Sequence, residues 1–423
     1  MKEGSFGMRW IVLALMFFAY VINYADKAII GYAADPLMKE LGLNSAQWGM
    51  VGSSFYWLFA IAALLGGTWS DRIGTSKMIV VLLLAWTVLQ SGSYAIMTLP
   101  MLILYRLLLG ALEGPFGPVV MSHAAKWFPP EKRGIAFAVI VSGASVGGII
   151  SAPILVAMIE KYGWRLTFAL LGVVSLVLAF VWLFVDRKNK NHPSNQIALS
   201  KVKKLRWADI SPVLRNPACF LTLALAFSAF WLSTWLLIWL PLYLTKVLHL
   251  EPMIMAYAVA GSGVAATVMV LVLSSFSDHL YKMSKSDFKS RVLVSGIVTL
   301  IGGFSLAFMP VFDSFIWIFV ALCLAKTSSY SIATVGPQIL IKLMPERAGF
   351  MTSIYSFITN IASIVAPVIT GILVQAAGNN FVLGFHYSFY VIVGLFLVTG
   401  ILFLVFVRPD QPSKDIPLQV KSV

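Results

Sequence analysis

Long apolar runs recur along the whole chain, each about the length needed to cross a lipid bilayer. A helix rises about 1.5 Å per residue, so roughly 20 apolar residues cross a hydrocarbon core about 30 Å thick. The pattern predicts an all-α membrane protein. Its twelve predicted transmembrane helices are 9–32, 46–70, 78–98, 100–123, 134–158, 164–186, 217–245, 253–277, 290–311, 313–341, 348–374 and 382–407.

One long polar stretch, 187–215, interrupts this pattern and carries eight basic residues. Its composition is typical of a linker and divides the predicted helices six and six. We therefore expect an N-terminal six-helix bundle at 1–186, a cytoplasmic linker at 187–215, a C-terminal six-helix bundle at 216–408 and a cytoplasmic tail at 409–423.

Composition indicates that lipid surrounds most of the surface. The chain is 59% hydrophobic and 11% charged, whereas soluble domains average about 45–50% apolar and about 25% charged residues. Its two cysteines, Cys219 and Cys323, both fall inside predicted helices and have no metal-ligand spacing. We expect no metal and no cofactor.

The net charge of +14 reports orientation rather than a polyanionic partner. With the N-terminus inside, the predicted external loops hold only Lys39, Lys161, Arg165 and Lys246, and most of the 31 Lys and Arg residues lie in cytoplasmic segments. This asymmetry follows the positive-inside rule. It predicts a multi-pass protein of the cell membrane with both termini cytoplasmic and no nucleic-acid partner.

A repeated motif supports two related halves. Pro130-Glu131-Lys132-Arg133-Gly134 precedes the helix at 134–158, and Pro345-Glu346-Arg347-Ala348-Gly349 precedes the helix at 348–374.

The loop Gly67-Thr68-Trp69-Ser70-Asp71-Arg72-Ile73-Gly74 resembles the signature of the major facilitator superfamily. Within that superfamily, three further features resemble the anion:cation symporters, which include bacterial sugar-acid:proton symporters. These are Asn23-Tyr24-Ala25-Asp26-Lys27, the pair Arg106 and Glu113, and Trp239-Leu240-Pro241-Leu242-Tyr243-Leu244. The resemblance implies two pseudo-symmetric six-helix bundles and transport by alternating access.

Five charges lie within predicted helices, away from their ends: Asp26, Lys27, Arg106, Glu113 and Lys326. Each costs at least about 2.5–3.5 kcal/mol at the centre of a lipid-facing helix, so such residues usually face a bundle interior or a cavity and act there. The alternative is a set of paired charges that only hold helices together. Three cations against two carboxylates favour an anionic substrate.

Spacing relates these charges to one another. Arg106 and Glu113 are seven residues apart, so both project from nearly the same face of one helix. Asp26 and Arg106 both fall in the outer half of the membrane, and we expect them to form an ion pair. Gly114-Pro115-Phe116-Gly117-Pro118 follows Glu113, and its prolines predict an interrupted helix.

The resemblance assigns roles to four of the five. Glu113 and Asp26 are expected to couple protons, and Arg106 and Lys27 to bind the anionic group of the substrate. Burial generally favours the neutral form of a carboxyl, which suits a group that takes up and releases protons. Lys326 has no counterpart in the family's motifs; it either clamps the anion from the second half or pairs with a carbonyl or carboxylate.

Further residues are weaker candidates. We expect Tyr24 and Asn360 to line the cavity, although interhelical hydrogen bonding is an equal alternative. Trp235 is a candidate substrate contact, or else an ordinary packing residue.

A separate set near the cytoplasmic surface is expected to act in gating. Asp71 and Arg72 close that face by contacting Glu131 and Arg133.

The family pattern is incomplete at the site. Sugar-acid symporters often carry arginine where this chain has Lys27, and tyrosine or glutamine at the positions of Phe59, Ala63 and Ala144. Hydroxyl-rich substrates need hydrogen-bond partners. The sequence therefore favours a simpler or aromatic carboxylate over a hexonate.

We expect a monomeric proton-coupled symporter that imports a small organic anion. An organic phosphate/phosphate or other anion exchanger is one alternative, and a non-transporting sensor on the same fold is another. An enzyme is not expected, because no nucleophile, metal set or catalytic dyad emerges.

Overall fold

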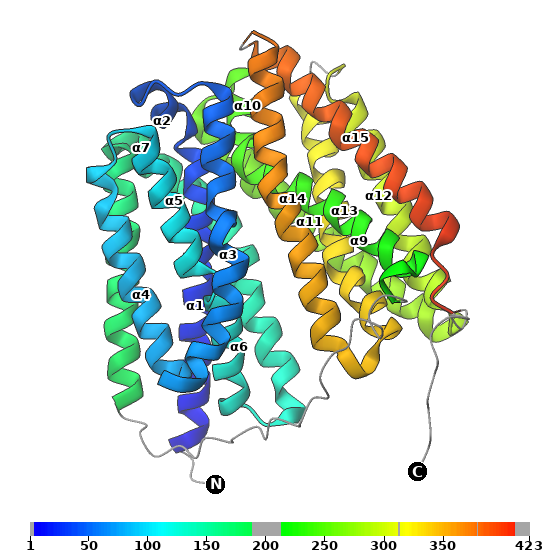
Figure 1. Ribbon diagram of the computed structural model, residues 1–423, viewed down its shortest axis with the longest axis horizontal. Helices are drawn as coiled ribbons and strands as arrows, with labels where there is room; N and C mark the ends of the chain where they lie inside the picture. The colour runs from blue at the N-terminus through cyan, green and yellow to red at the C-terminus, as the bar shows by residue number, and fades with distance from the viewer. Residues whose placement is uncertain (1–3, 188–212, 312–313, 379, 411–423) are drawn as a thin grey trace. The chain divides into compact units, whose positions relative to one another are not determined.

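The computed structural model describes residues 4–187, 213–311, 314–378 and 380–410 of the chain, and nearly all of them are helical (Figure 1). The linker residues 188–212 and the tail residues 411–423 lie outside the described part, so the predicted division at 187–215 stays a prediction. The helices are α1 (Gly4–Tyr32), α2 (Ala34–Glu40), α3 (Ser45–Ile73), α4 (Thr75–Ser91), η1 (Gly92–Ala95), α5 (Leu99–Glu113), α6 (Phe116–Trp127), α7 (Pro130–Arg187), α9 (Pro217–Ile238), α10 (Leu240–Lys246), α11 (Pro252–Ser284), η2 (Phe288–Val292), α12 (Leu293–Phe308), α13 (Phe315–Leu343), η3 (Pro345–Arg347), α14 (Ala348–Ala376) and α15 (Phe381–Phe406).

Helix lengths agree with the predicted number of membrane crossings. Among the described residues, 11 helices are long and apolar enough to span a bilayer, one of them over the 55 residues Glu131–Val185. That segment is too long for one crossing of about 30 Å. Its backbone leaves the helical conformation at Gly163, where φ is 78°, a value that favours glycine. Counting its two halves separately gives the twelve predicted spans.

Two crossings are interrupted where the sequence contains helix-breaking residues. α5 ends at Glu113 and α6 begins at Phe116, so the predicted interruption at Gly114-Pro115 is confirmed. α9 ends at Ile238 and α10 begins at Leu240, with proline in its first turn. Proline lacks a backbone donor and clashes with the preceding turn, which explains why the interruptions fall at these points.

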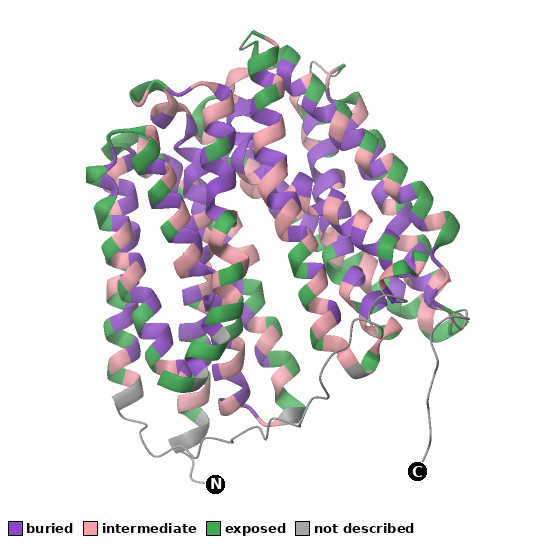
Figure 2. Ribbon diagram, viewed as in Figure 1, coloured by how far each residue is buried: buried purple, intermediate pink, exposed green. Residues whose placement is uncertain are grey.

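Most helices have both buried and exposed residues, which lie on different faces of the helix. Purple buried residues and green exposed ones alternate along individual helices in Figure 2. Many exposed side chains are large and apolar, such as Leu64, Val88, Phe180 and Phe304. Soluble proteins rarely expose so much apolar surface, which identifies the exposed faces as lipid-facing.

The described residues form two units. Unit 1 draws on Met1–Ile197, Trp235–Gly263 and Ile364–Phe385, and unit 2 on Ala198–Thr234, Val264–Ser363 and His386–Val423. In unit 2, an apolar core joins α9, α13, α14 and α15, with Leu225, Ile339, Met351 and Phe403 among its buried members.

Glycines allow close helix contacts within unit 1. A Cβ atom at Gly110 or Gly114 would overlap the carbonyl oxygen of Phe55 or Phe59, so these positions bring the backbones of α3 and α5 together. Gly31 meets the carbonyl oxygen of Leu237 in the same way. Small residues at such contacts are typical of helix packing in membranes.

An ion pair joins α10 to α2. The Lys246 Nζ atom at the end of α10 is 2.6 Å from Asp35 Oδ1 in α2, and Lys39 pairs with the other carboxylate oxygen at 2.9 Å. Within unit 1, the end of α10 is therefore held to the segment that follows α1.

Candidate functional site

A three-residue cluster links α1 to α5. The Asn23 Nδ2 group donates a hydrogen bond of 2.8 Å to Glu113 Oε2, and Lys27 Nζ donates one of 2.9 Å to Asn23 Oδ1. Lys27 Nζ also lies 3.6 Å from Glu113 Oε2. Asn23 and Lys27 are four residues apart on α1, so they share a face of the helix. We call this cluster the Asn23–Lys27–Glu113 triad.

Arg106 lies in α5 two turns before Glu113, as its spacing predicts. Its side chain is 1% exposed, and its guanidinium lies over the Phe55 ring at 4.7 Å from the centroid. The Nε and Nη1 atoms of Arg106 donate to no acceptor in the part of the chain that the structure describes. A buried cation therefore retains unused hydrogen-bond donors beside the triad.

Asp26 is fully buried in α1, and neither of its carboxylate oxygens accepts a hydrogen bond from a described residue. The expected Asp26–Arg106 ion pair is wrong: among the described residues, Lys27 instead pairs with Glu113. Asp26 directly precedes Lys27, and consecutive residues point about 100° apart around a helix. The lysine therefore takes the face of α1 that meets Glu113, and Asp26 points elsewhere.

The surroundings of Asp26 include two residues that the sequence did not single out. The side chain of Gln90 approaches its carboxyl group, and Gln90 Oε1 accepts a hydrogen bond from the Tyr105 hydroxyl. Asp26 also interacts electrostatically with Glu113 and Lys27. The two carboxyl groups therefore belong to one electrostatic system.

Such a site can bind an anion and exchange protons. Isolated buried charges are costly and are usually paired. Here Arg106 offers free donors, Asp26 offers free acceptors, and Glu113 Oε1 also accepts no hydrogen bond from a described residue. An anionic group can use the donors, and a proton can neutralise either carboxylate.

The remaining predicted substrate contacts are placed differently. Tyr24 is partly buried in α1, and its ring lies against Gly148 of α7. Trp235 is fully buried and packs against the rings of Tyr243 and Phe385, which favours a packing role.

Two candidates belong to unit 2. Lys326 is buried in α13 at 7% exposure. The Oδ1 atom of Asn360 in α14 is buried and accepts no hydrogen bond from the described residues.

Three of the predicted gating residues, Arg72, Glu131 and Arg133, form no ion pair with one another in the described part of the chain. Arg72 and Glu131 are exposed, and Arg133 Nε donates to the backbone oxygen of Phe128 at 3.0 Å. The side chain of Asp71 lies outside the described part, so the gating role stays a prediction.

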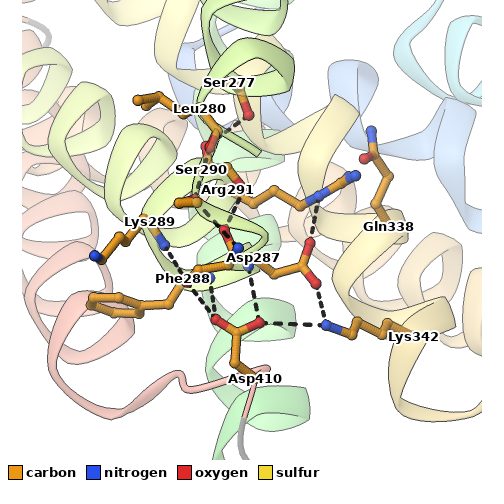
Figure 3. A network of polar contacts seen from close by, with 12 residues as sticks. Ser277, Leu280, Asp287, Phe288, Lys289, Ser290, Arg291, Gln338, Lys342 and Asp410 are labelled. Atoms are coloured by element: carbon orange, nitrogen blue, oxygen red, sulfur yellow. Dashed lines mark hydrogen bonds and ion pairs between the residues drawn. The ribbon is translucent and has the colours of Figure 1, made fainter. Parts of the chain in front are cut away.

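A second polar cluster, shown in Figure 3, joins three elements of unit 2. Asp287, which precedes η2, forms ion pairs with Lys342 of α13 and with Arg291, the latter at 2.8 Å. Asp410 follows α15 and accepts hydrogen bonds from the backbone nitrogens of Asp287 (2.9 Å) and Phe288 (3.0 Å). We call these four charged residues the Asp287 staple.

Asp410 also accepts a hydrogen bond of 2.6 Å from Ser286 Oγ. Burial raises the pKa of the Asp410 carboxyl. Hydrogen bonds from Ser286 and from the backbone of Phe288 and Asp287, together with the charge of Lys342, outweigh this and hold the pKa below its usual range. Both carboxylates of the staple therefore have partners in the described part of the chain.

A family model described as Major Facilitator Superfamily matches residues 16–342 and 328–422. A hexuronate transporter of Bacillus subtilis (strain 168) is 28% identical over 94% of this chain and 94% of its own. A probable galactarate/D-glucarate transporter of the same organism is 27% identical over 88% of this chain and 87% of its own. A solved bacterial homologue of the human lysosomal transporter Spinster has a TM-score of 0.78 at 16% identity and covers 93% of this chain and 96% of its own.

Proposed function

The chain belongs to the major facilitator superfamily, and from this premise we propose that it imports a small organic anion together with protons. It is a multi-pass membrane transporter and not an enzyme. The relatives named as hexuronate and galactarate/D-glucarate transporters move carboxylates, which supports an organic anion as substrate. In this proposal the protein lies in the cell membrane with both termini cytoplasmic.

The observation that carries the proposal is the position of Lys27. This lysine contacts Asn23 and Glu113 in the triad, and its side chain is 20% exposed whereas that of Glu113 is fully buried. An anion that reaches Lys27 therefore competes with Glu113 for the same positive charge. Arg106, with its unused donors, gives the anion a second contact.

Proton coupling follows from this competition. When Lys27 turns to the substrate, Glu113 loses its cationic neighbour while it remains buried. A buried carboxylate without a partner is strongly unfavourable, so proton uptake at Glu113 accompanies anion binding. Asp26, the second buried carboxyl, is the proposed second proton site.

Proton coupling offsets the electrical cost of anion import against the membrane potential. Moving one negative charge inward against an inside-negative potential costs about 2.3 kcal/mol per 100 mV. A proton carried with each anionic charge cancels that term. Import by alternating access then exposes the site to each side in turn.

Gating is proposed at two places. The Asp35–Lys246 ion pair would open when the outer side opens. Asp71, Arg72, Glu131 and Arg133 would act at the cytoplasmic side.

The test is uptake into proteoliposomes that contain the purified protein. Radiolabelled benzoate, glucuronate and inorganic phosphate are supplied outside, with the lumen buffered one pH unit more alkaline. We expect one carboxylate to accumulate above its equilibrium level and a protonophore to abolish the accumulation. Uptake that needs an anion inside the vesicle and ignores the pH gradient would instead establish an exchanger.

A further inference from the structure

Two phenylalanines of α3 lie beside both cations of the site. Lys27 Nζ is 5.0 Å from the centroid of the Phe59 ring and 6.0 Å from that of Phe55. Arg106 lies over Phe55 at 4.7 Å. The two rings are 5.5 Å apart. We call Phe55 and Phe59 the aromatic shelf.

Backbone contacts with two glycines place the aromatic shelf at the depth of Arg106 and Glu113. Phe55 and Phe59 are four residues apart and share one face of α3. Gly110 of α5 contacts the carbonyl oxygen of Phe55, and Gly114, which directly follows α5, contacts that of Phe59. A Cβ atom at either glycine would overlap the oxygen. The shelf is therefore in register with the part of α5 that carries Arg106 and Glu113.

The amide of Asn23, which bonds Lys27 beside the shelf, is already in use. The amide of Asn23 donates to Glu113 and accepts from Lys27, so both of its ends are engaged. The shelf itself carries no hydrogen-bonding side-chain atom, and Ala63 follows Phe59 one turn along α3. A substrate hydroxyl held against these rings would lose its hydrogen bonds to water and gain none from the rings, which weakens binding for each unpaired hydroxyl.

We infer that the aromatic shelf is a specificity determinant that selects carboxylates with an aromatic or apolar body over polyhydroxylated sugar acids. The carboxylate binds Lys27 and Arg106, and the body of the substrate packs on Phe59. Phe59 is only partly buried, so its ring has a face that a ligand can cover. The inference rests on the proposed function, because it places the anion at the same two cations.

The test compares two monoanions that differ in their bodies. Binding of benzoate and glucuronate to the purified full-length protein is measured by isothermal titration calorimetry at fixed pH and ionic strength. We expect benzoate to bind at least about tenfold more tightly, because several glucuronate hydroxyls would remain unpaired.

Two variants report on the shelf. Phe59→Leu removes the ring and should weaken benzoate binding about three- to tenfold, in line with the value of an aromatic contact. Its effect on glucuronate binding should be small. Phe59→Tyr adds a hydroxyl to the ring and should strengthen glucuronate binding. Phe18→Leu, at a side chain of α1 that is 55% exposed, is the matched control and should change neither.

Opposite results would overturn the inference. Glucuronate binding as tightly as benzoate to the unmodified protein would contradict it, as would an unchanged preference in both Phe59 variants that still elute as folded protein. Transport of glucuronate in preference to benzoate would agree with the proposed function and contradict only the inference about the aromatic shelf. If neither anion binds or moves and phosphate does, the proposed function fails, and the inference fails with it.

Discussion

Lys27 and Glu113 in unit 1 and Lys342 and Asp287 in unit 2 are both ion pairs between different helical segments, yet their surroundings differ. Near the first pair, Arg106 and Asp26 are buried with unused polar atoms. In the Asp287 staple, both carboxylates have partners, and Lys342 remains 47% exposed. Partnered charges at a helix end stabilise the fold, whereas buried charges with unused atoms lower stability and persist where function requires them.

The comparison predicts opposite effects of mutation in the two regions. In the site, transport should fall while stability holds. In the staple, stability should fall while transport holds.

The largest expected effect is on transport by Arg106→Met. The change removes a cation that we propose contacts the substrate, and we expect uptake to fall by at least about 100-fold, the value of roughly 3 kcal/mol of lost binding in the transition state. The melting temperature should not fall, because an apolar side chain of similar length replaces a buried charge with unused donors. Uptake assays and thermal unfolding on one preparation check both statements.

Arg215→Met is the control for this variant, because Arg215 is exposed. It should leave uptake and melting unchanged. Normal transport by Arg106→Met would show that Arg106 does not bind the substrate.

Asp287→Asn should show the reverse behaviour. Loss of the charge weakens the contacts to Lys342 and Arg291 and should lower the free energy of unfolding by about 1.5–3 kcal/mol, the range for hydrogen bonds to charged groups. Uptake per folded molecule should stay within about twofold. Asp278→Asn, at an exposed position of α11, is the matched control. A staple variant that melts normally but fails to transport would show that the staple acts in the transport cycle.

A smaller effect is expected for Asp410→Asn. The carboxylate accepts backbone hydrogen bonds at the start of η2, as an N-cap does, and its loss should cost about 1 kcal/mol. A depressed pKa stabilises the fold above the ordinary aspartate pKa of about 3.9, and this contribution is lost as pH falls through the lower folded value. The difference in melting temperature between wild type and variant should therefore stay constant from pH 6 to pH 8. A difference that disappears within that range would contradict the stated charge state.

The fold could be predicted from the sequence because its main signals are local. Apolar runs of bilayer length mark the spans, and Gly114-Pro115 marks the break beside Glu113. A single glycine, Gly163, turns what is otherwise one continuous helix into two crossings.

The site was only partly predictable. Spacing along α5 placed Arg106 and Glu113 on one face, but the partner of each depends on how α1 is rotated against α5. Helix counting placed Asp26 at the depth of Arg106, but it could not predict this rotation. In the structure, the rotation of α1 brings Lys27 rather than Asp26 to α5, where Lys27 pairs with Glu113. Asn23 was visible one turn before Lys27, whereas Gln90 and Tyr105 meet only in three dimensions.

Glu113→Gln tests the central claim that Glu113 and the substrate share Lys27. Glutamine keeps the shape of the side chain and cannot take up a proton. In proteoliposomes, we expect counterflow driven by a substrate gradient to continue and accumulation driven by a pH gradient to be abolished, while Glu251→Gln, at an exposed position, retains both. Unchanged pH-driven accumulation by Glu113→Gln would contradict the account.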